Sequence, residues 1–132
     1  MQALSTISTV LIGLVGLANL LPVVGVLSAA RLQSLYGVVL EDANLVVLMR
    51  HRAVLFGVVG GLLLTSAFHA PLRPVGIAVG LTSMLSFVLI AWLVGDTNPE
   101  LRRVVAVDWV ASAALVAAVL LDRFVASGGL AA

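Results

Sequence analysis

The stretch MQALSTISTVLIGLVGLANLLPVVGVLSAA, residues 1–30, decides the fold because it contains no charged side chain. A helix needs about 20 consecutive apolar residues to cross the hydrocarbon of a bilayer, so we predict a first membrane span over residues 4–30. Pro22 should kink or divide this helix, since proline lacks a backbone N–H and its ring clashes with a carbonyl one turn earlier. A cleaved signal peptide is the alternative, but the stretch lacks a basic start and its apolar run is too long.

Three further apolar blocks follow the first, separated by short polar segments. The connection over residues 31–43 is too polar to lie in lipid, and we expect it at the interface. Asn44 is one candidate N-cap of the second helix, and Glu41 and Asp42 are also expected to cap it, since acidic groups favour the positive end of its dipole. The prolines of the later connections indicate tight turns at residues 69–74 and 98–99. We predict the remaining spans at residues 44–68, 75–95 and 104–121, followed by a flexible tail at residues 127–132.

The composition favours a membrane protein over a soluble domain. Hydrophobic residues make up 62% of the 132 residues and charged residues only 10%, whereas about 25% of a typical soluble domain is charged. The formal net charge of +1 gives no drive toward nucleic acid. We therefore predict an all-α fold, an integral membrane four-helix bundle that forms a single domain over residues 1–132.

Cysteine is absent, which excludes disulfides, thiol nucleophiles and cysteine metal sites. His51 and His69 lie at opposite ends of the second span, about 27 Å apart at 1.5 Å per residue, so they cannot share a metal ion. No Gly-rich phosphate loop or catalytic motif is present. We predict no metal site and no cofactor.

The arginines predict the orientation. An even number of spans puts both termini on one side, and five of the seven arginines fall in the first and third connections or the adjoining helix ends. By the positive-inside rule that face is cytoplasmic and both termini lie outside. Tyr36, Trp92 and Trp109 fall near the same face, as an interfacial aromatic belt would. The five arginines are Arg31, Arg50, Arg52, Arg102 and Arg103.

Small residues recur four positions apart in three of the predicted spans, which favours close packing of helix backbones. The pairs are Gly57 and Gly61, Gly76 and Gly80, and Ala113 and Ala117.

Arg50, His51 and Arg52 lie in the first turns of the second span, at a depth similar to that of Asp108 in the fourth. Because both helices start from the same predicted face, we expect the Asp108 carboxylate to meet Arg50 or His51 inside the bundle, where an unpaired charge would be costly. Successive helix residues diverge by about 100°, so the three cannot all face one partner. One or two of them are expected to reach lipid phosphates instead.

Two interpretations of this cluster stay open. In the structural one, Asp108 neutralises a buried arginine and the other cations hold the protein at its depth. In the functional one, a polar pocket lies under the headgroups, with Asp108 or His51 as a proton donor or acceptor and arginine as an anion anchor. Asn19, beside the expected kink, would extend the pocket inward. The candidate binding residues are Asn19, Tyr36, Arg50, Arg52 and Asp108, and the catalytic candidates are His51 and Asp108.

Three short stretches resemble a known family: Leu35-Tyr36-Gly37, Met49-Arg50-His51-Arg52, and Arg102-Arg103 with Asp108. In layout and in these stretches the chain resembles the DoxX-like small four-helix membrane proteins of bacteria. The resemblance implies an inner-membrane four-helix bundle, in a family sometimes associated with redox or lipid-related systems. It supplies no established catalytic residues.

The leading hypothesis is a bundle that binds a lipid or an apolar small molecule, or that serves as an accessory subunit of a larger membrane complex. Membrane lipids are the expected partners, together with a homo-oligomer or such a complex. One alternative is a membrane-embedded acid/base enzyme, an isomerase or hydrolase of an apolar substrate, that uses Asp108, His51 and Arg50. Another is a dimeric small-molecule transporter, for which we expect a carboxylate nearer mid-membrane than Asp108.

The orientation can be tested by cysteine labelling, because the chain has no cysteine of its own. We expect a cysteine at position 98 to react with an impermeant thiol reagent only from inside the cell. A cysteine at position 71 should react only from outside, and the opposite pattern would reject the predicted orientation.

Overall fold

The computed structural model describes residues 1–128, and every regular element in this part of the chain is helical. The elements are α1 (Gln2–Leu20), η1 (Leu21–Val26), α2 (Ala29–Tyr36), α3 (Ala43–Phe68), η2 (Ala70–Leu72), α4 (Arg73–Val94) and α5 (Pro99–Gly128). Four segments are long and apolar enough to cross a membrane: Gln2–Val26, Ala43–Phe68, Ala70–Val94 and Pro99–Gly128. The predicted all-α membrane bundle is confirmed, and the chain is a multi-pass membrane protein.

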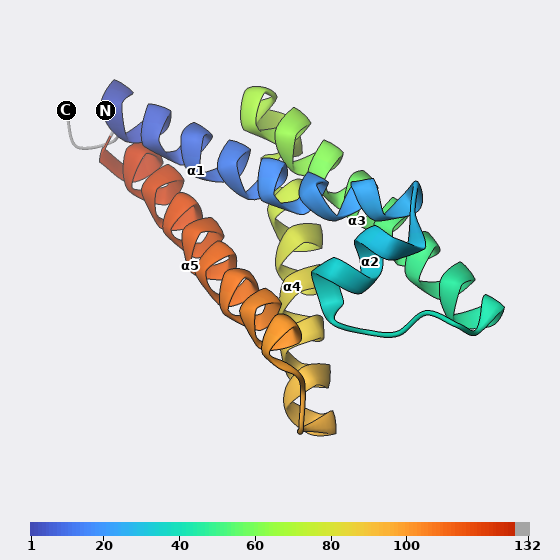
Figure 1. Ribbon diagram of the computed structural model, residues 1–132. Coiled ribbons are helices and arrows are strands. Elements are labelled where there is room, and N and C mark those ends of the chain that lie inside the picture. The colour runs from blue at the N-terminus through green and yellow to red at the C-terminus, as the bar shows by residue number, and fades with distance from the viewer. Residues whose placement is uncertain (129–132) are drawn as a thin grey trace.

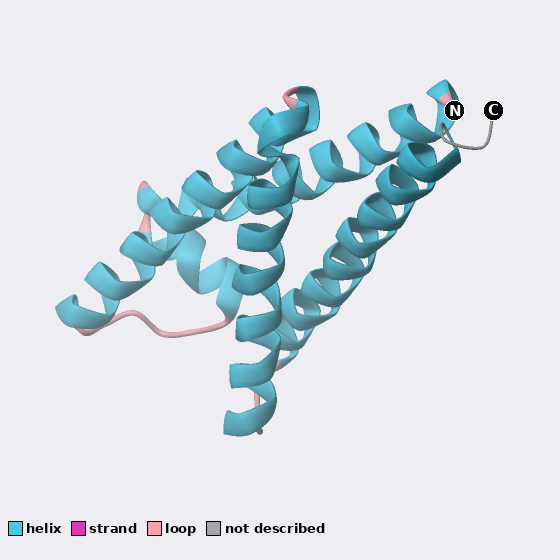
Figure 2. Ribbon diagram, turned by 180° about the vertical axis from the view of Figure 1, so that it is seen from behind, coloured by secondary structure: helices cyan, strands magenta, loops and turns pink. Residues whose placement is uncertain are grey.

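The long helices form a bundle that is splayed at one end (Figures 1 and 2). α1 packs against α3 and α5, and α4 packs against the same two helices. Gly128 at the end of α5 lies beside Met1, so the two ends of the described chain are on the same side. From this closed end α1 and α5 diverge, and the short helix α2 lies in the space that opens between them (Figure 1).

The first span is divided at Pro22, as predicted. α1 ends at Leu20, and the N–H of Leu21 bonds to the carbonyl of Ala18, three residues back rather than four. A 3-10 helix carries the chain to Val26, so the membrane segment ends short of residue 30. The predicted interfacial connection then contains α2, which buries Leu32 and Tyr36 in a small core against α3 and α5.

Side chains cap the starts of α3 and α5. Asp42 is the N-cap of α3, since its carboxylate accepts the N–H of Asn44 at 2.7 Å. The expected cap at Asp42 is therefore confirmed, and Asn44, the other candidate, lies inside the helix. Asn98 is positioned to cap α5, because its side chain accepts the N–H of Leu101 at 2.8 Å.

This bond explains why α5 begins at Pro99 instead of residue 104. α5 also continues past residue 121 to Gly128, so the first part of the predicted tail is helical. Residues 129–132 of that tail lie outside the described residues.

The closest helix crossing joins α1 and α3 at Gly16 and Gly60. A Cβ added to Gly60 would lie 2.8 Å from the Gly16 carbonyl oxygen, and one on Gly16 would lie 3.1 Å from the Gly60 oxygen. Of the predicted small-residue pairs, Gly76 and Gly80 do pack closely, against side chains of α3 and α5. Gly61 has no packing neighbour at its Cβ position and Ala113 is exposed, so these two were predicted wrongly.

Replacing Gly60 by alanine should destabilise the protein by about 1 to 3 kcal/mol, because the new methyl group forces α1 and α3 apart. The matched control is Gly61→Ala, which meets open space and should be neutral or gain up to about 1 kcal/mol of helix propensity. Thermal unfolding in detergent measures both. Equal melting of the two variants would show that this crossing does not hold α1 against α3.

Candidate functional site

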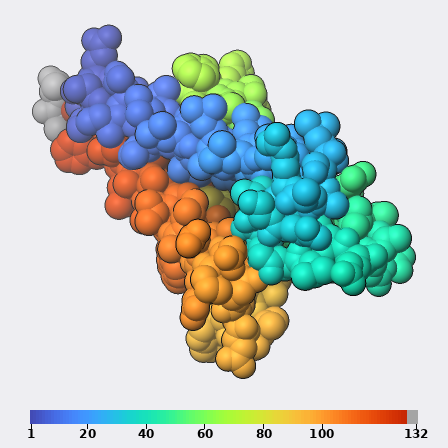
Figure 3. All heavy atoms as spheres, viewed as in Figure 1, coloured from blue at the N-terminus to red at the C-terminus, as the bar shows by residue number. Residues whose placement is uncertain are grey.

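A groove opens between α1, η1 and α2 on one side and α5 on the other, and we call it the α2 groove. Its volume is about 330 Å³, and the surface is hollowed between these elements in Figure 3. Apolar side chains such as Leu21, Leu35, Val104 and Val107 supply much of its lining. Polar side chains also reach it, from both walls: Asn19, Ser34, Tyr36, Glu100, Arg103 and Asp108.

The end of α2 is tied to the start of α5, which fixes one edge of the groove. α2 ends at Tyr36, and Gly37 caps it. The φ of Gly37 is 62°, in the left-handed region, and its N–H bonds to the Gln33 carbonyl. Asn98 donates to the carbonyl of Tyr36 at 2.8 Å and to that of Gly37 at 3.2 Å. The left-handed backbone angle favours glycine at this position, and a Cβ there would also displace the Glu100 carboxylate, since it would lie 2.7 Å from one of its oxygens. Pro99, exposed beside Asn98, offers a labelling position that leaves these bonds intact.

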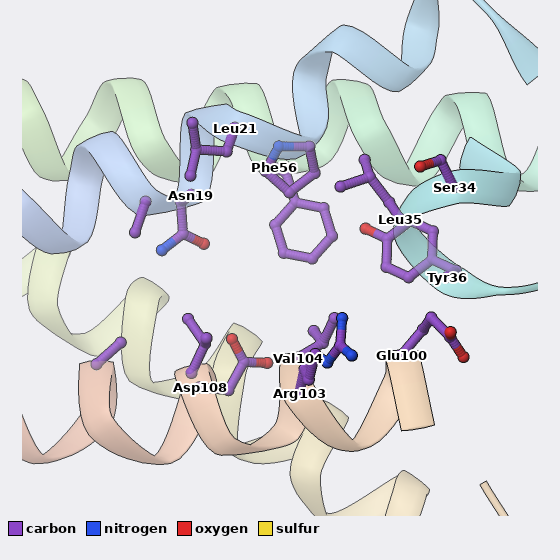
Figure 4. A pocket seen from close by; sticks show the side chains of 14 residues that line it. Asn19, Leu21, Ser34, Leu35, Tyr36, Phe56, Glu100, Arg103, Val104 and Asp108 are labelled. Carbon is purple, nitrogen blue, oxygen red and sulfur yellow. The ribbon is translucent and has the colours of Figure 1, made fainter. Parts of the chain in front are cut away.

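Asp108 is the most unusual side chain of the groove. It is 7% exposed, and its Oδ2 atom is buried without a hydrogen-bond partner. In Figure 4 its carboxylate points from α5 into the space that Asn19 and Tyr36 face from the opposite wall. The predicted binding residues Asn19, Tyr36 and Asp108 therefore come together in one groove.

Asn19 and Tyr36 are the two polar side chains that face Asp108 across the groove. The Asn19 side-chain N–H group donates to the carbonyl of Val15 at 3.0 Å, within α1. Tyr36 is 3% exposed. Burial raises the pKa of its phenol above the ordinary value, although the charge of Arg52 lowers it. The phenol is protonated at neutral pH, so it has a proton to donate.

Arg52 is the inward-facing cation of α3. Its guanidinium carbon lies 5.1 Å from the ring centre of Tyr36, 5.2 Å from that of Phe56 and 4.4 Å from that of Phe87. Cation–π attraction of this kind is worth about 0.5 to 2 kcal/mol per contact. The Nη2 atom of Arg52 is nevertheless buried without a hydrogen-bond partner. This aromatic cage, formed by α2, α3 and α4, keeps the cation inside the bundle.

The predicted pairing of Asp108 with Arg50 or His51 is wrong. Both of these side chains are exposed, and neither lines the α2 groove. The reason is helix geometry: Arg52 shares its face of α3 with Phe56, four residues on, whereas Arg50 and His51 point elsewhere. Arg52 acts electrostatically on Asp108, but within the described chain only Arg73 and Asp122 come within the 4.0 Å of an ion pair.

Two consequences follow for the other predicted residues. The catalytic candidates His51 and Asp108 do not share a site, because only Asp108 lines the groove. Tyr36 is buried and so is not part of an interfacial aromatic belt, whereas Trp92 and Trp109 are 75% and 57% exposed.

The ion pair that closes the opposite end of the bundle was not foreseen. Arg73 Nη1 lies 3.2 Å from a carboxylate oxygen of Asp122. The Nη2 atom of Arg73 donates to the Ala67 carbonyl at 2.9 Å and to the Thr9 hydroxyl. One side chain of α4 thereby joins α1, α3 and α5. The signal was present in the sequence, since the predicted topology places Arg73 and Asp122 at the same membrane face with opposite charges.

Comparison with known proteins adds no relative: no family model, no curated protein and no solved structure matches the chain. The resemblance to DoxX-like proteins therefore stays a prediction. Within residues 1–128, no group of three or more histidine, aspartate or glutamate side chains is arranged to hold a metal ion.

The two aspartates of α5 should respond differently to the same isosteric change. Asp122→Asn removes the charge that Arg73 pairs with, and we expect a loss of about 1 to 3 kcal/mol. Asp108→Asn removes a buried charge whose Oδ2 atom makes no hydrogen bond, and we expect stability equal to or above that of the original protein, because an unpaired buried charge is costly. Unfolding in detergent compares the variants. A larger loss for Asp108→Asn than for Asp122→Asn would mean that Asp108 holds the fold.

Proposed function

We propose that this protein binds a membrane lipid or another apolar small molecule in the α2 groove. The observation that carries the proposal is the buried carboxylate of Asp108, which lines the groove with an unpartnered oxygen. Ligand sites are typically concave and mostly apolar, with a few convergent polar groups that fix orientation. The groove has this composition, with Asn19 and Tyr36 facing Asp108 across it (Figure 4).

The contrast between the two aspartates of α5 supports a role beyond folding. Asp122 is paired with Arg73 and joins the ends of the helices. Asp108 is more deeply buried, yet makes no ion pair. An ionisable residue inside a membrane segment is costly, so such residues usually mark a binding or transport function. A ligand in the groove would supply the partner that the fold does not.

Binding accounts for the geometry better than the enzymatic and transport alternatives. The acid/base enzyme was predicted to use His51 with Asp108, and the two do not share a site. Asp108 lies on the splayed-end side of the middle of α5, whereas a transport path favours a carboxylate at mid-membrane. An accessory subunit of a membrane complex stays the alternative if the groove proves empty of lipid.

We further propose that the groove opens toward the cytoplasmic face of a bacterial inner membrane, with both termini outside. Arg31, Arg50, Arg102 and Arg103 are exposed at the splayed end of the bundle. At the closed end, one of the two arginines is already paired with Asp122. This asymmetry supports the orientation predicted by the positive-inside rule.

Filling the groove tests the proposal. Val107 is 54% exposed and lines the groove, whereas Val116 is 48% exposed on the same helix but does not. We expect Val107→Trp to lower the amount of co-purified lipid by about tenfold, because an overpacked site costs about 1 to 3 kcal/mol. Val116→Trp is the matched control and should retain the lipid. Native mass spectrometry of the purified protein measures both.

Equal lipid retention by the two tryptophan variants would reject the groove as the binding site. Absence of any retained lipid or small molecule from the original protein would favour the accessory-subunit hypothesis instead.

A further inference from the structure

The α2 groove continues into a second, apolar groove that runs along α1 and α5. This α1–α5 groove has a volume of about 490 Å³. It shares Ala18, Val107 and Ala111 with the α2 groove, so the two form one continuous depression. Its lining is apolar throughout and includes Leu11, Leu14, Val110 and Ala114.

The order of the two grooves along α5 matches the layers of a bilayer. The α2 groove begins at Glu100, close to the start of the helix, and its polar groups extend inward to Asp108. The α1–α5 groove occupies residues 106–114, around the middle of the helix. A molecule lying in both would have its polar head on the interface side, with Asp108 as the innermost polar group, and its apolar part deeper in the membrane, the orientation of a lipid.

The deep polar atoms of the α2 groove offer mainly acceptors. Asp108 Oδ2 has no donor. The side-chain nitrogen of Asn19 donates to the Val15 carbonyl and, more weakly, to the Met84 sulfur, which leaves the side-chain oxygen of Asn19 for the groove. The Tyr36 hydroxyl both donates and accepts. A head group must therefore bring at least one hydrogen-bond donor.

The charges around this point disfavour an ionic head group. A carboxylate or phosphate would meet Asp108 and Glu100, which both line the groove. An ammonium would meet the field of Arg52, whose charge acts on both Tyr36 and Asp108, and Arg103 at the groove. Each ion would also meet the opposite charges of the groove, so neither gains a net attraction that offsets its loss of hydration. A neutral hydroxyl avoids both conflicts, since it donates to Asp108 and accepts from Tyr36.

We infer that the two grooves together bind a neutral single-chain amphiphile with a hydroxyl-bearing head, of the monoacylglycerol or long-chain alcohol class. The head lies between Asp108, Asn19 and Tyr36, and the chain lies between α1 and α5. This assignment rests on the proposed function, because it names the ligand class of the same groove.

Photocrosslinking of the full chain in phosphatidylcholine nanodiscs tests the assignment. Three probes carry a diazirine near the chain end and have equal chain length: a monoacylglycerol, a fatty acid and an alkylamine. We expect the monoacylglycerol to label residues 106–114 of α5 at least about tenfold more than either ionic probe, the ratio that one hydrogen bond to a charged group gives. Excess unlabelled monoacylglycerol should remove this labelling.

Two substitutions of Asp108 test whether labelling depends on its hydrogen-bond acceptor or only on the shape of the groove. Asp108→Leu removes the acceptor and should lower monoacylglycerol labelling about tenfold. Asp108→Asn keeps one acceptor oxygen and should retain most of it. Ala106→Trp, at an exposed position of the α1–α5 groove, should block labelling without touching the head site. If Asp108→Leu does not fold, the Ala106→Trp variant still tests whether the probe lies in the α1–α5 groove.

The outcomes distinguish the ligand class from the proposed function. Labelling by the fatty acid or the alkylamine that equals or exceeds that of the monoacylglycerol would overturn the neutral head group while leaving a binding groove. Labelling by none of the probes, together with no co-purified lipid, would overturn both. Crosslinks from residue 110 to a second copy of the chain would show that a protein surface occupies the α1–α5 groove and would also overturn the assignment.

Discussion

Pro22 lacks a backbone N–H, and its ring excludes the carbonyl that would sit one turn earlier in a continuous α-helix. The chain therefore leaves α1 at Leu20 and tightens into the 3-10 helix η1, which delivers α2 to the space between α1 and α5 (Figure 1). A straight first helix would leave no segment to hold that space. The splayed end, the α2 groove and the position of Tyr36 all depend on this break.

The bundle is asymmetric along its length, and the asymmetry has a chemical basis. At the closed end, Arg73 satisfies Asp122 and hydrogen-bonds to α1 and α3, and a continuous core lies beside it. At the open end, Arg52 is held by aromatic faces instead of by a carboxylate. The cage therefore keeps a cation near Asp108 without closing the groove, as a direct ion pair between α3 and α5 would do.

Hydropathy was enough to predict the membrane helices, because a span in hydrocarbon must be a long apolar run that satisfies its own backbone. The break in the first helix was likewise predictable, because it follows from the missing N–H and the ring of Pro22 alone. The facing of Arg50, His51 and Arg52 was not predictable, since all three are polar and no periodic signal separates them. The packing of Gly16 against Gly60 was missed for a related reason. Gly16 lies in α1 and Gly60 in α3, and a search for small residues repeated within one helix cannot find a pair formed between two helices.

The two aspartates of α5 have different roles that the sequence does not distinguish. Both are single acidic residues within a long apolar helix, and composition cannot rank them. Tertiary structure separates them, because α4 brings Arg73 to Asp122, whereas α2 holds Tyr36 and the edge of a groove opposite Asp108. A bundle selected only for stability would replace an unpartnered buried aspartate with an apolar residue. The presence of Asp108 beside an apolar groove accords with the proposal that a ligand from the membrane supplies the missing hydrogen-bond donor.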